Sequence, residues 1–141
     1  MIDHARIMST TVQHEHEQGV IKAFVLHEKQ ERFLTFLSKS KTRKKLTQEL
    51  ADFRCFDPRF ATPIPWKGVQ GIENIHGLLK AKGAGNSCWA MSEDSTLDGK
   101  EVDLESLLEK VIDNQMGTIL SCLPGKLALF ASADAHLLLS K

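Results

Sequence analysis

The sequence predicts an α+β domain in which N-terminal helices precede a small, mostly antiparallel sheet with one or two packed helices. Apolar residues at helical spacing dominate the first half of the chain. Short apolar segments joined by tight-turn signals cluster in the second half. Strands that follow one another through tight turns favour antiparallel pairing, and a length of 141 residues suits a single domain, residues 1–141.

Two helices are expected before residue 54. Residues 1–10 lack an apolar period and are expected to be flexible. Residues 11–38 show helical spacing, but Gly19 costs about 1 kcal/mol relative to alanine, so this helix could begin near Gly19. A second helix is expected over residues 42–53, with Thr42 as its N-cap.

Residues 54–68 are predicted to form an extended loop that packs on the domain. Three of the four prolines lie here, and each removes an amide donor and biases its predecessor away from helix. The aromatic residues of the loop are expected to face the core or a partner. Arginine and tryptophan often dominate interface energies, so we expect a partner-binding surface here. Its candidate residues are Pro58, Arg59, Phe60, Pro65 and Trp66.

The second half of the chain alternates between short helices and strands. A helix over residues 71–82 is expected to end at Gly83. Asp103 is expected to cap a helix that Asn114 can end, and its apolar residues follow the helical period. The remaining patterns predict strands over residues 87–93, 100–102, 117–123, 126–132 and 136–140, with turns at Asp98-Gly99 and Pro124-Gly125.

The overall composition excludes several classes of protein. The net charge is zero and the pI is about 7, so no global field attracts nucleic acid or a membrane. The N-terminus does not resemble a secretory signal, and no apolar stretch is long enough to span a bilayer. Three widely spaced cysteines do not suggest a disulfide framework. We therefore expect a cytoplasmic protein with reduced thiols.

The stretch VQHEHEQG, residues 12–19, is the most suggestive of a metal site. On a helix, His14 and His16 point about 200° apart and cannot share a metal ion, because helical ligand pairs need a spacing of three or four residues. The stretch is instead interpreted as the solvated first turn of a helix, where Glu15 and Glu17 offset the positive end of the helix dipole. We expect no metal and no cofactor.

A basic segment at residues 39–45 is a second candidate site. Its cations precede a predicted helix, where free amides and the helix dipole also favour an anion such as phosphate or RNA. The alternative is a solvated corner between helices. An acidic stretch, residues 93–113, could face this segment within the fold or between two copies. The anion-binding candidates are Lys39, Lys41, Arg43, Lys44 and Lys45.

The thiols give a weak catalytic hypothesis. Cys88 and Cys122 both lie in predicted strands and would be neighbours if those strands are adjacent. His76 is the histidine nearest the predicted core and could activate one of them. Buried cysteines that act as small apolar residues are the alternative, and Cys55 has no evident partner.

Four phrases carry a resemblance to a known family. They are FDPRFATPIP, LLKAKGA, SEDSTLDGKE and GTILSCLPGKLALF, and they occur in this order between residues 54 and 131. The chain resembles a family of small uncharacterised bacterial proteins with these phrases. The resemblance implies a bacterial, cytoplasmic protein and carries no functional residue across.

The sequence favours a non-catalytic binding or adaptor domain over an enzyme, since no catalytic constellation converges. The expected partner is another protein or a second copy of the chain, with nucleic acid as a less favoured ligand and no membrane. Phosphate or RNA binding through the basic segment and a small cysteine-dependent enzyme are the alternatives.

Overall fold

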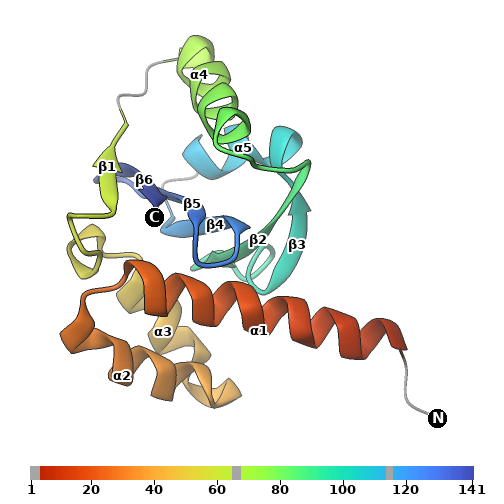
Figure 1. Ribbon diagram of the computed structural model, residues 1–141, viewed down its shortest axis with the longest axis vertical. Helices are drawn as coiled ribbons and strands as arrows, with labels where there is room; N and C mark the ends of the chain where they lie inside the picture. The colour runs from red at the N-terminus through yellow and green to blue at the C-terminus, as the bar shows by residue number, and fades with distance from the viewer. Residues whose placement is uncertain (1–3, 65–67, 114–115) are drawn as a thin grey trace.

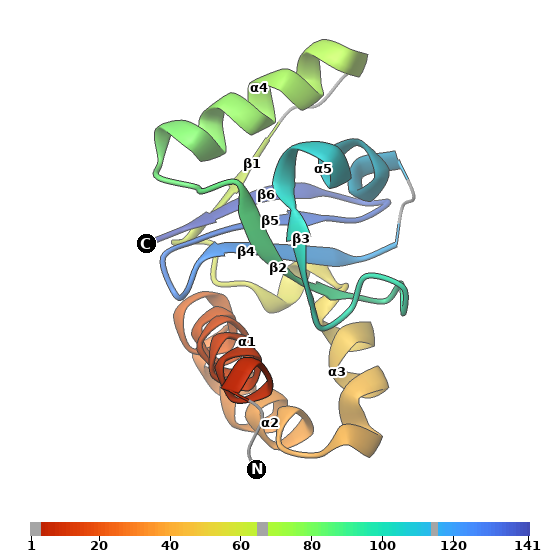
Figure 2. The same cartoon turned by 90° about the vertical axis from the view of Figure 1, so that its right-hand side faces the viewer.

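The computed structural model describes residues 4–64, 68–113 and 116–141. It has the expected α+β architecture, with the N-terminal helices before the sheet. One antiparallel sheet lies between two groups of helices, with α1 to α3 on one face and α4 and α5 on the other (Figures 1 and 2). None of the helices in these ranges is both long enough and apolar enough to cross a membrane.

The helices are α1 (His4–Phe24), α2 (His27–Leu37), α3 (Arg43–Leu50), α4 (Gly68–Ala81) and α5 (Leu104–Asp113). Two short 3-10 turns cover Ser40–Thr42 and Phe53–Cys55. The strands are β1 (Ala61–Pro63), β2 (Ser87–Ser92), β3 (Lys100–Asp103), β4 (Thr118–Leu123), β5 (Leu127–Ala131) and β6 (His136–Ser140).

The strands follow the order β1-β6-β5-β4-β2-β3, and every neighbouring pair is antiparallel. The β4–β5 and β5–β6 pairs are hairpins, and the first of them turns at Pro124-Gly125, as predicted. Gly125, in the first of these turns, has a φ of 68°, which is the left-handed conformation that glycine tolerates best. Helices cover both faces of the central strands.

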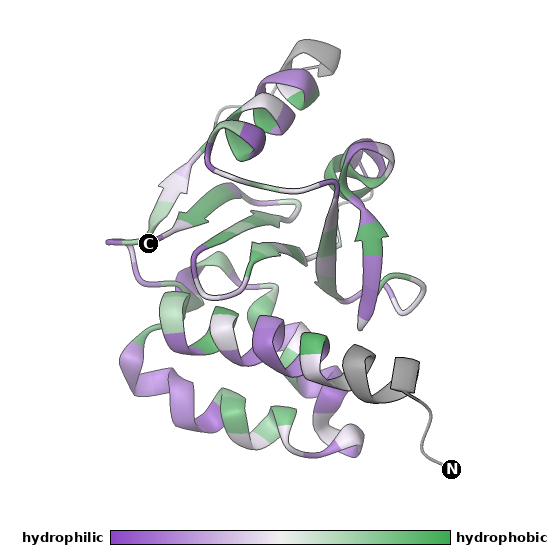
Figure 3. Ribbon diagram, turned by 45° about the vertical axis from the view of Figure 1, so that its right-hand side comes forward, coloured by the Kyte–Doolittle hydropathy of each residue, from purple (hydrophilic) through white to green (hydrophobic). Residues whose placement is uncertain are grey.

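Alternating residues of each central strand divide the core into two layers. Trp89, Ile119 and Phe130 face α1, α2 and α3, whereas Ala90 and Leu120 belong to the layer beneath α4 and α5. This two-residue period follows from the pleat of a strand. Figure 3 shows the apolar residues concentrated on the strands between the two helical layers.

The single helix expected over residues 11–38 is instead two helices, and the first begins at His4, in a segment expected to be loose. The break lies at Val25 and Leu26. Val25 forms a β-bridge with Phe56, and the amide of Leu26 donates to the carbonyl of Cys55 at 2.9 Å. The chain leaves the helix here because the Leu26 amide and the Phe24 carbonyl bond to the segment that begins the proline loop.

Helix α1 also continues through Gly19, where the sequence left a possible helix start. A Cβ atom at Gly19 would lie 2.7 Å from the amide nitrogen of Gly125 in the β4–β5 turn. Distances this short are not found for real Cβ atoms, so glycine is required for the close approach of helix and hairpin. Gly19 therefore fixes where α1 crosses the sheet.

The predictions for the other helix ends are confirmed at two positions and wrong at one. Asp103 caps α5 as predicted, because its Oδ2 accepts hydrogen bonds from Ser106 N at 3.0 Å and Ser106 Oγ at 2.7 Å. Gly83 follows α4 with a φ of 108°, also as predicted. Thr42 precedes α3 but does not cap it, since its hydroxyl donates to the carbonyls of Phe36 and Lys39. Asn114 lies outside the described residues.

The predicted loop over residues 54–68 contains the edge strand β1. Ser140 N donates to the carbonyl of Phe60, and Ile64 N donates to that of His136. Hydrogen bonding alternates along an antiparallel strand, so Ala61 and Pro63 direct their backbone groups away from β6. Pro63 has no N–H to offer there, which protects this edge against a further strand. At the other edge, β3 carries exposed charged residues.

Gly19→Ala is expected to destabilise the protein by about 1–3 kcal/mol, because the added methyl group overpacks the contact with Gly125. The helix propensity of alanine, which favours the variant by about 1 kcal/mol, does not offset this. Urea denaturation monitored by tryptophan fluorescence measures the difference.

Gly77→Ala in α4 is the matched control. A Cβ atom at Gly77 has no neighbour within 4 Å, so this variant should be unchanged or more stable. A Gly19→Ala protein as stable as the wild type would contradict the role of Gly19.

Candidate functional site

An ion network that is buried at Glu17 and half-buried at Arg43 and Asp98 joins α1 to α3 and to the loop after β2. Glu17, only 1% exposed, accepts hydrogen bonds from Arg43 Nη1 at 2.5 Å and Nη2 at 2.6 Å. Arg43 also donates to both carboxylate oxygens of Asp98, from Nε at 2.9 Å and from Nη2 at 2.8 Å. Trp89 Nε1 and Gln13 Nε2 donate to Glu17 at 2.9 Å and 3.2 Å. The carboxylate of Glu17 therefore has a donor for both of its oxygens.

This network corrects the solvated interpretation of residues 12–19. His14 and Glu15 are exposed, but Glu17 lies in the interior. Burial opposes the charge on Arg43, yet the hydrogen bonds and charges of Asp98 and Glu17 outweigh it and raise the pKa of the guanidinium. The acidic and basic segments thus meet within the fold, through Arg43 and Asp98.

His16 lies beside this network, half-buried against the sheet. Its ring stacks on that of Trp89 with 6.3 Å between centroids, and its Nδ1 lies 2.7 Å from Ser121 Oγ. Burial lowers the pKa of His16, while the nearby carboxylates Glu15, Glu101 and Glu17 act in the opposite direction. The net lowering of its pKa favours the neutral imidazole.

A pocket of about 320 Å³ opens between α1 and the end of the sheet where β2 begins. Glu101 on its wall accepts a hydrogen bond from Ser87 Oγ at 2.9 Å. Ser121 is fully buried, so its hydroxyl is not available as a nucleophile. Its contact with Nδ1 instead orients the ring of His16. The lining residues are Val12, His16, Gly83, Gly85, Ser87, Cys88, Trp89, Glu101, Cys122 and Leu123.

The predicted partner-binding loop is only partly described. Pro58 and Arg59 are exposed and Phe60 is half-buried, whereas Pro65 and Trp66 lie outside the described residues. Arg59 pairs with Asp57, with 2.7 Å between Nη2 and Oδ2. The hydrogen bonds of Arg59 lower the pKa of Asp57.

The loop contributes to a positively charged surface that the sequence did not indicate. The Arg59 guanidinium lies 5.1 Å and the Lys141 ammonium 4.8 Å from the centre of the Phe60 ring. The amide of Lys141 donates to the carbonyl of Lys126 at 3.0 Å. Lys82, Lys126 and Lys141 line a hollow of about 370 Å³ together with Leu123, Leu127 and Ser140. We call Arg59, Phe60, Lys82, Lys126 and Lys141 the basic face.

The predicted anion-binding segment is divided by the fold. Arg43 turns inward to Glu17 and Asp98, so it serves the interior. The remaining members are exposed at the corner between α2 and α3 (Lys39, Lys41, Lys44 and Lys45).

The cysteines are all buried, and Cys88 and Cys122 lie on adjacent strands. His76 is found near Asp103: hydrogen bonds from Ser106 lower the pKa of Asp103, and the charges of Lys80 and His76 act in the same direction. The charges that act on the two thiols come from Asp103, Glu101 and Lys80. The cysteine–histidine hypothesis therefore gains no support from the placement of His76.

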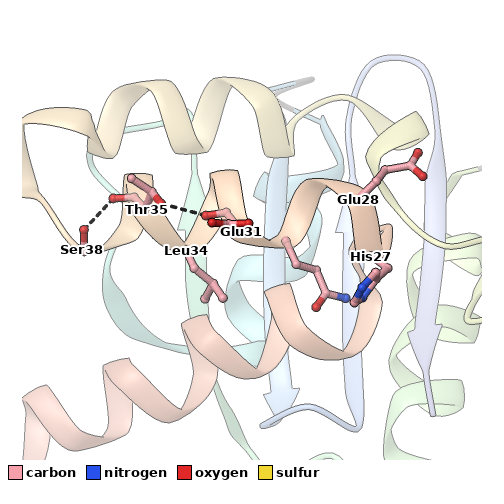
Figure 4. Close-up of a pocket in the computed structure, with 7 residues that line it drawn as sticks. His27, Glu28, Glu31, Leu34, Thr35 and Ser38 are labelled. Carbon is pink, nitrogen blue, oxygen red and sulfur yellow. Dashed lines mark hydrogen bonds between the residues drawn. The ribbon is translucent and has the colours of Figure 1, made fainter.

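A shallow groove of about 630 Å³ runs along α2 (Figure 4). Its polar side chains bond locally: Thr35 Oγ1 donates to the carbonyl of Glu31, and Ser38 Oγ donates to that of Thr35. The labelled side chains spread along the helix and do not converge on one point. The groove therefore offers no constellation for binding.

No group of three or more potential metal ligands is found within the residues that the structure describes. Comparisons of the chain with protein-family models, with curated proteins and with solved structures found no match. The resemblance to a bacterial family therefore stays a prediction.

Glu17→Gln is expected to destabilise the protein by about 3 kcal/mol, because the charge of Arg43 loses its most buried partner. Urea denaturation compares this variant with Glu49→Gln, which removes the same charge from the exposed Arg32–Glu49 pair and should change stability little. Equal losses in the two variants would contradict the role of the network.

The stability of the protein is expected to fall as the pH drops below about 6.5, partly because of His16. The unfolded chain takes up the proton at its usual pKa of 6.5, but folded His16 resists protonation until the pH is lower. An NMR titration of the imidazole should give a midpoint below 6.5 for His16. The His16→Gln protein should lose less stability on acidification than wild type, with His14→Gln as the control.

Proposed function

We propose that this chain is a non-catalytic protein-binding domain whose basic face docks an acidic segment of a partner protein. The observation that carries the proposal is the exposed pair of cations beside Phe60, Arg59 and Lys141, together with the adjoining hollow, which Lys82 and Lys126 also line. Arg59 pairs with Asp57, and within the described residues Lys82, Lys126 and Lys141 have no salt bridge. The net charge of the chain is zero, so these cations form a local surplus of positive charge. Such a surplus favours binding to a partner surface of negative charge.

The chemistry of the basic face suits a protein ligand. Phe60 supplies an aromatic surface that is partly exposed, and the exposed guanidinium of Arg59 lies beside it while its Nε and Nη2 bond to Asp57. Leu123 and Leu127 add apolar area to the floor of the hollow. Aromatic and arginine side chains at the centre of a patch, with charged residues at its rim, are typical of protein interfaces.

The exposed lysines at the corner between α2 and α3 favour a second candidate, binding to RNA or another polyphosphate. Four lysines remain exposed there, and within the described residues none of them has an ion pair. The absence of an aromatic side chain within residues 39–45 weighs against base stacking. For this reason we place protein binding first.

The double variant Arg59→Ala, Lys141→Ala is expected to lose its partner. The tagged protein would capture proteins from a lysate of its source organism after nuclease treatment, with quantification by mass spectrometry. A specific partner should carry an acidic segment, and its recovery should fall about tenfold or more with the double variant. The circular dichroism spectrum should remain that of the wild type, because both side chains lie on the surface.

Lys44→Ala, Lys45→Ala is the matched control, because it removes two equally exposed cations from the opposite candidate surface. It should leave partner recovery unchanged. Captured nucleic acid that is lost with this control variant would overturn the proposal in favour of RNA. Each phosphate contact with a single strand would then contribute a slope of about −0.7 to log affinity against log salt.

A further inference from the structure

The two cysteines on the central strands occupy directly opposed positions. Trp89 pairs with Ser121 across β2 and β4, and Glu93 N bonds to the carbonyl of Gly117 in the same register. Extending this register by one residue places Cys88 opposite Cys122. Alternation along the ladder makes Cys88–Cys122 a non-hydrogen-bonded pair, for which the Cα atoms lie about 4.5 Å apart.

This position suits a covalent bond between the sulfur atoms. A disulfide needs Cα atoms about 4.4–6.8 Å apart with both Cβ atoms on one side of the sheet. Both residues belong to the core layer beneath α4 and α5, so their side chains share a face. Cys122 Sγ donates to the Leu120 carbonyl at 3.7 Å, and each thiol shifts the pKa of the other, as expected of neighbouring side chains.

Both residues also border a pocket at the end of the sheet, which Cys55 does not line. Cys88 and Cys122 both line the pocket next to the exposed glycines Gly83 and Gly85. Cys55 lies in the other core layer, beyond the sheet. Burial and the charge of Asp52 raise the pKa of Cys55 to about 12, which leaves it a poor nucleophile.

The surroundings of the two thiols differ in a way that orders their reactions. The hydrogen bond from Cys88 lowers the pKa of Cys122, and the charge of Lys80 acts in the same direction. The hydrogen bond to Cys122 and burial raise the pKa of Cys88. Burial opposes the shift at Cys122, and its pKa nevertheless lies on the lowered side while that of Cys88 is raised, which favours Cys122 as the attacking thiol.

We propose that Cys88 and Cys122 form a reversible oxidative modification site at which a peroxide converts two thiols into a disulfide between β2 and β4. The Cys122 thiolate attacks one peroxide oxygen, so an S–O bond forms, the O–O bond breaks, and hydroxide leaves and takes a proton. Cys88 then attacks the sulfenic acid, an S–S bond forms, and the S–O bond breaks with loss of water. The cysteines lose two electrons and the peroxide gains them.

The reverse reaction needs a dithiol, which attacks the disulfide and is itself oxidised to a disulfide. Reversibility of this kind is typical of disulfides in a reducing compartment, where stable cross-links are rare. The site lies on β2 and β4 and uses no residue of the basic face. It is therefore independent of the proposed partner binding.

The test treats the folded wild-type protein with hydrogen peroxide at neutral pH, blocks the remaining thiols in denaturant with N-ethylmaleimide, and maps tryptic peptides by mass spectrometry. The expected product links peptide 83–100 to peptide 111–126 with the loss of two hydrogen atoms, while Cys55 is alkylated. Treatment with dithiothreitol should restore both thiols. All three cysteines alkylated after peroxide, or a disulfide that contains Cys55, would overturn the proposal.

Single variants test the order of the reactions. Cys88→Ser should accumulate a sulfenic acid at Cys122 that dimedone traps, because no second thiol is there to resolve it. Cys122→Ser should leave Cys88 unmodified under the same conditions. A sulfenic acid that appears at Cys88 instead would contradict the assigned order, and the wild-type peptide map decides the proposal even where a variant fails to fold.

Discussion

The position of the N-terminal helices depends on the buried ion pair between Glu17 and Arg43. Taking two charges out of water is costly, and a buried pair is seldom more stable than apolar side chains of the same volume. What the pair supplies here is geometry: bidentate hydrogen bonds hold α1 against α3, and the shared bonds to Trp89 and Asp98 attach both helices to β2 and to the loop after it. Displacement of any one of these elements would leave a charge in the interior without its partner.

Much of the fold could be predicted from the sequence because local patterns determine it. The strands β4, β5 and β6 follow from apolar segments separated by turn residues, and the cap at Asp103 follows from its position before an amphipathic helix. The division of residues 11–38 into two helices could not be predicted, because it results from the pairing of Val25 with Phe56, thirty-one residues further along the chain. The same holds for Gly19, whose local effect is to weaken a helix and whose actual role lies in the contact with Gly125.

The residues of the candidate sites were harder to identify than the elements that carry them. The sequence drew attention to residues 12–19 through their density of histidine and glutamate, but it gave no sign that Glu17 turns inward while Glu15 remains in solvent. Arg43 was one of several adjacent cations in the sequence. Its side chain is the one that points inward, because its position on α3 directs it toward Glu17 and Asp98. The lysines of the basic face are single residues scattered along the chain, at the end of α4, in the β4–β5 turn and after β6, so no local pattern indicates that they meet. The two strand cysteines were a recognisable pair only once the strand order was known.

Both edges of the sheet are closed to further main-chain pairing in the described part of the chain, by Pro63 at one end and by charged side chains at the other. The binding proposed above would then rely on side chains that stand on the surface and take no part in the hydrogen-bonded framework. Under that proposal, single exchanges at the surface would alter the partner without new selection for a folded sheet. The framework and the proposed binding surface would be free to diverge at different rates.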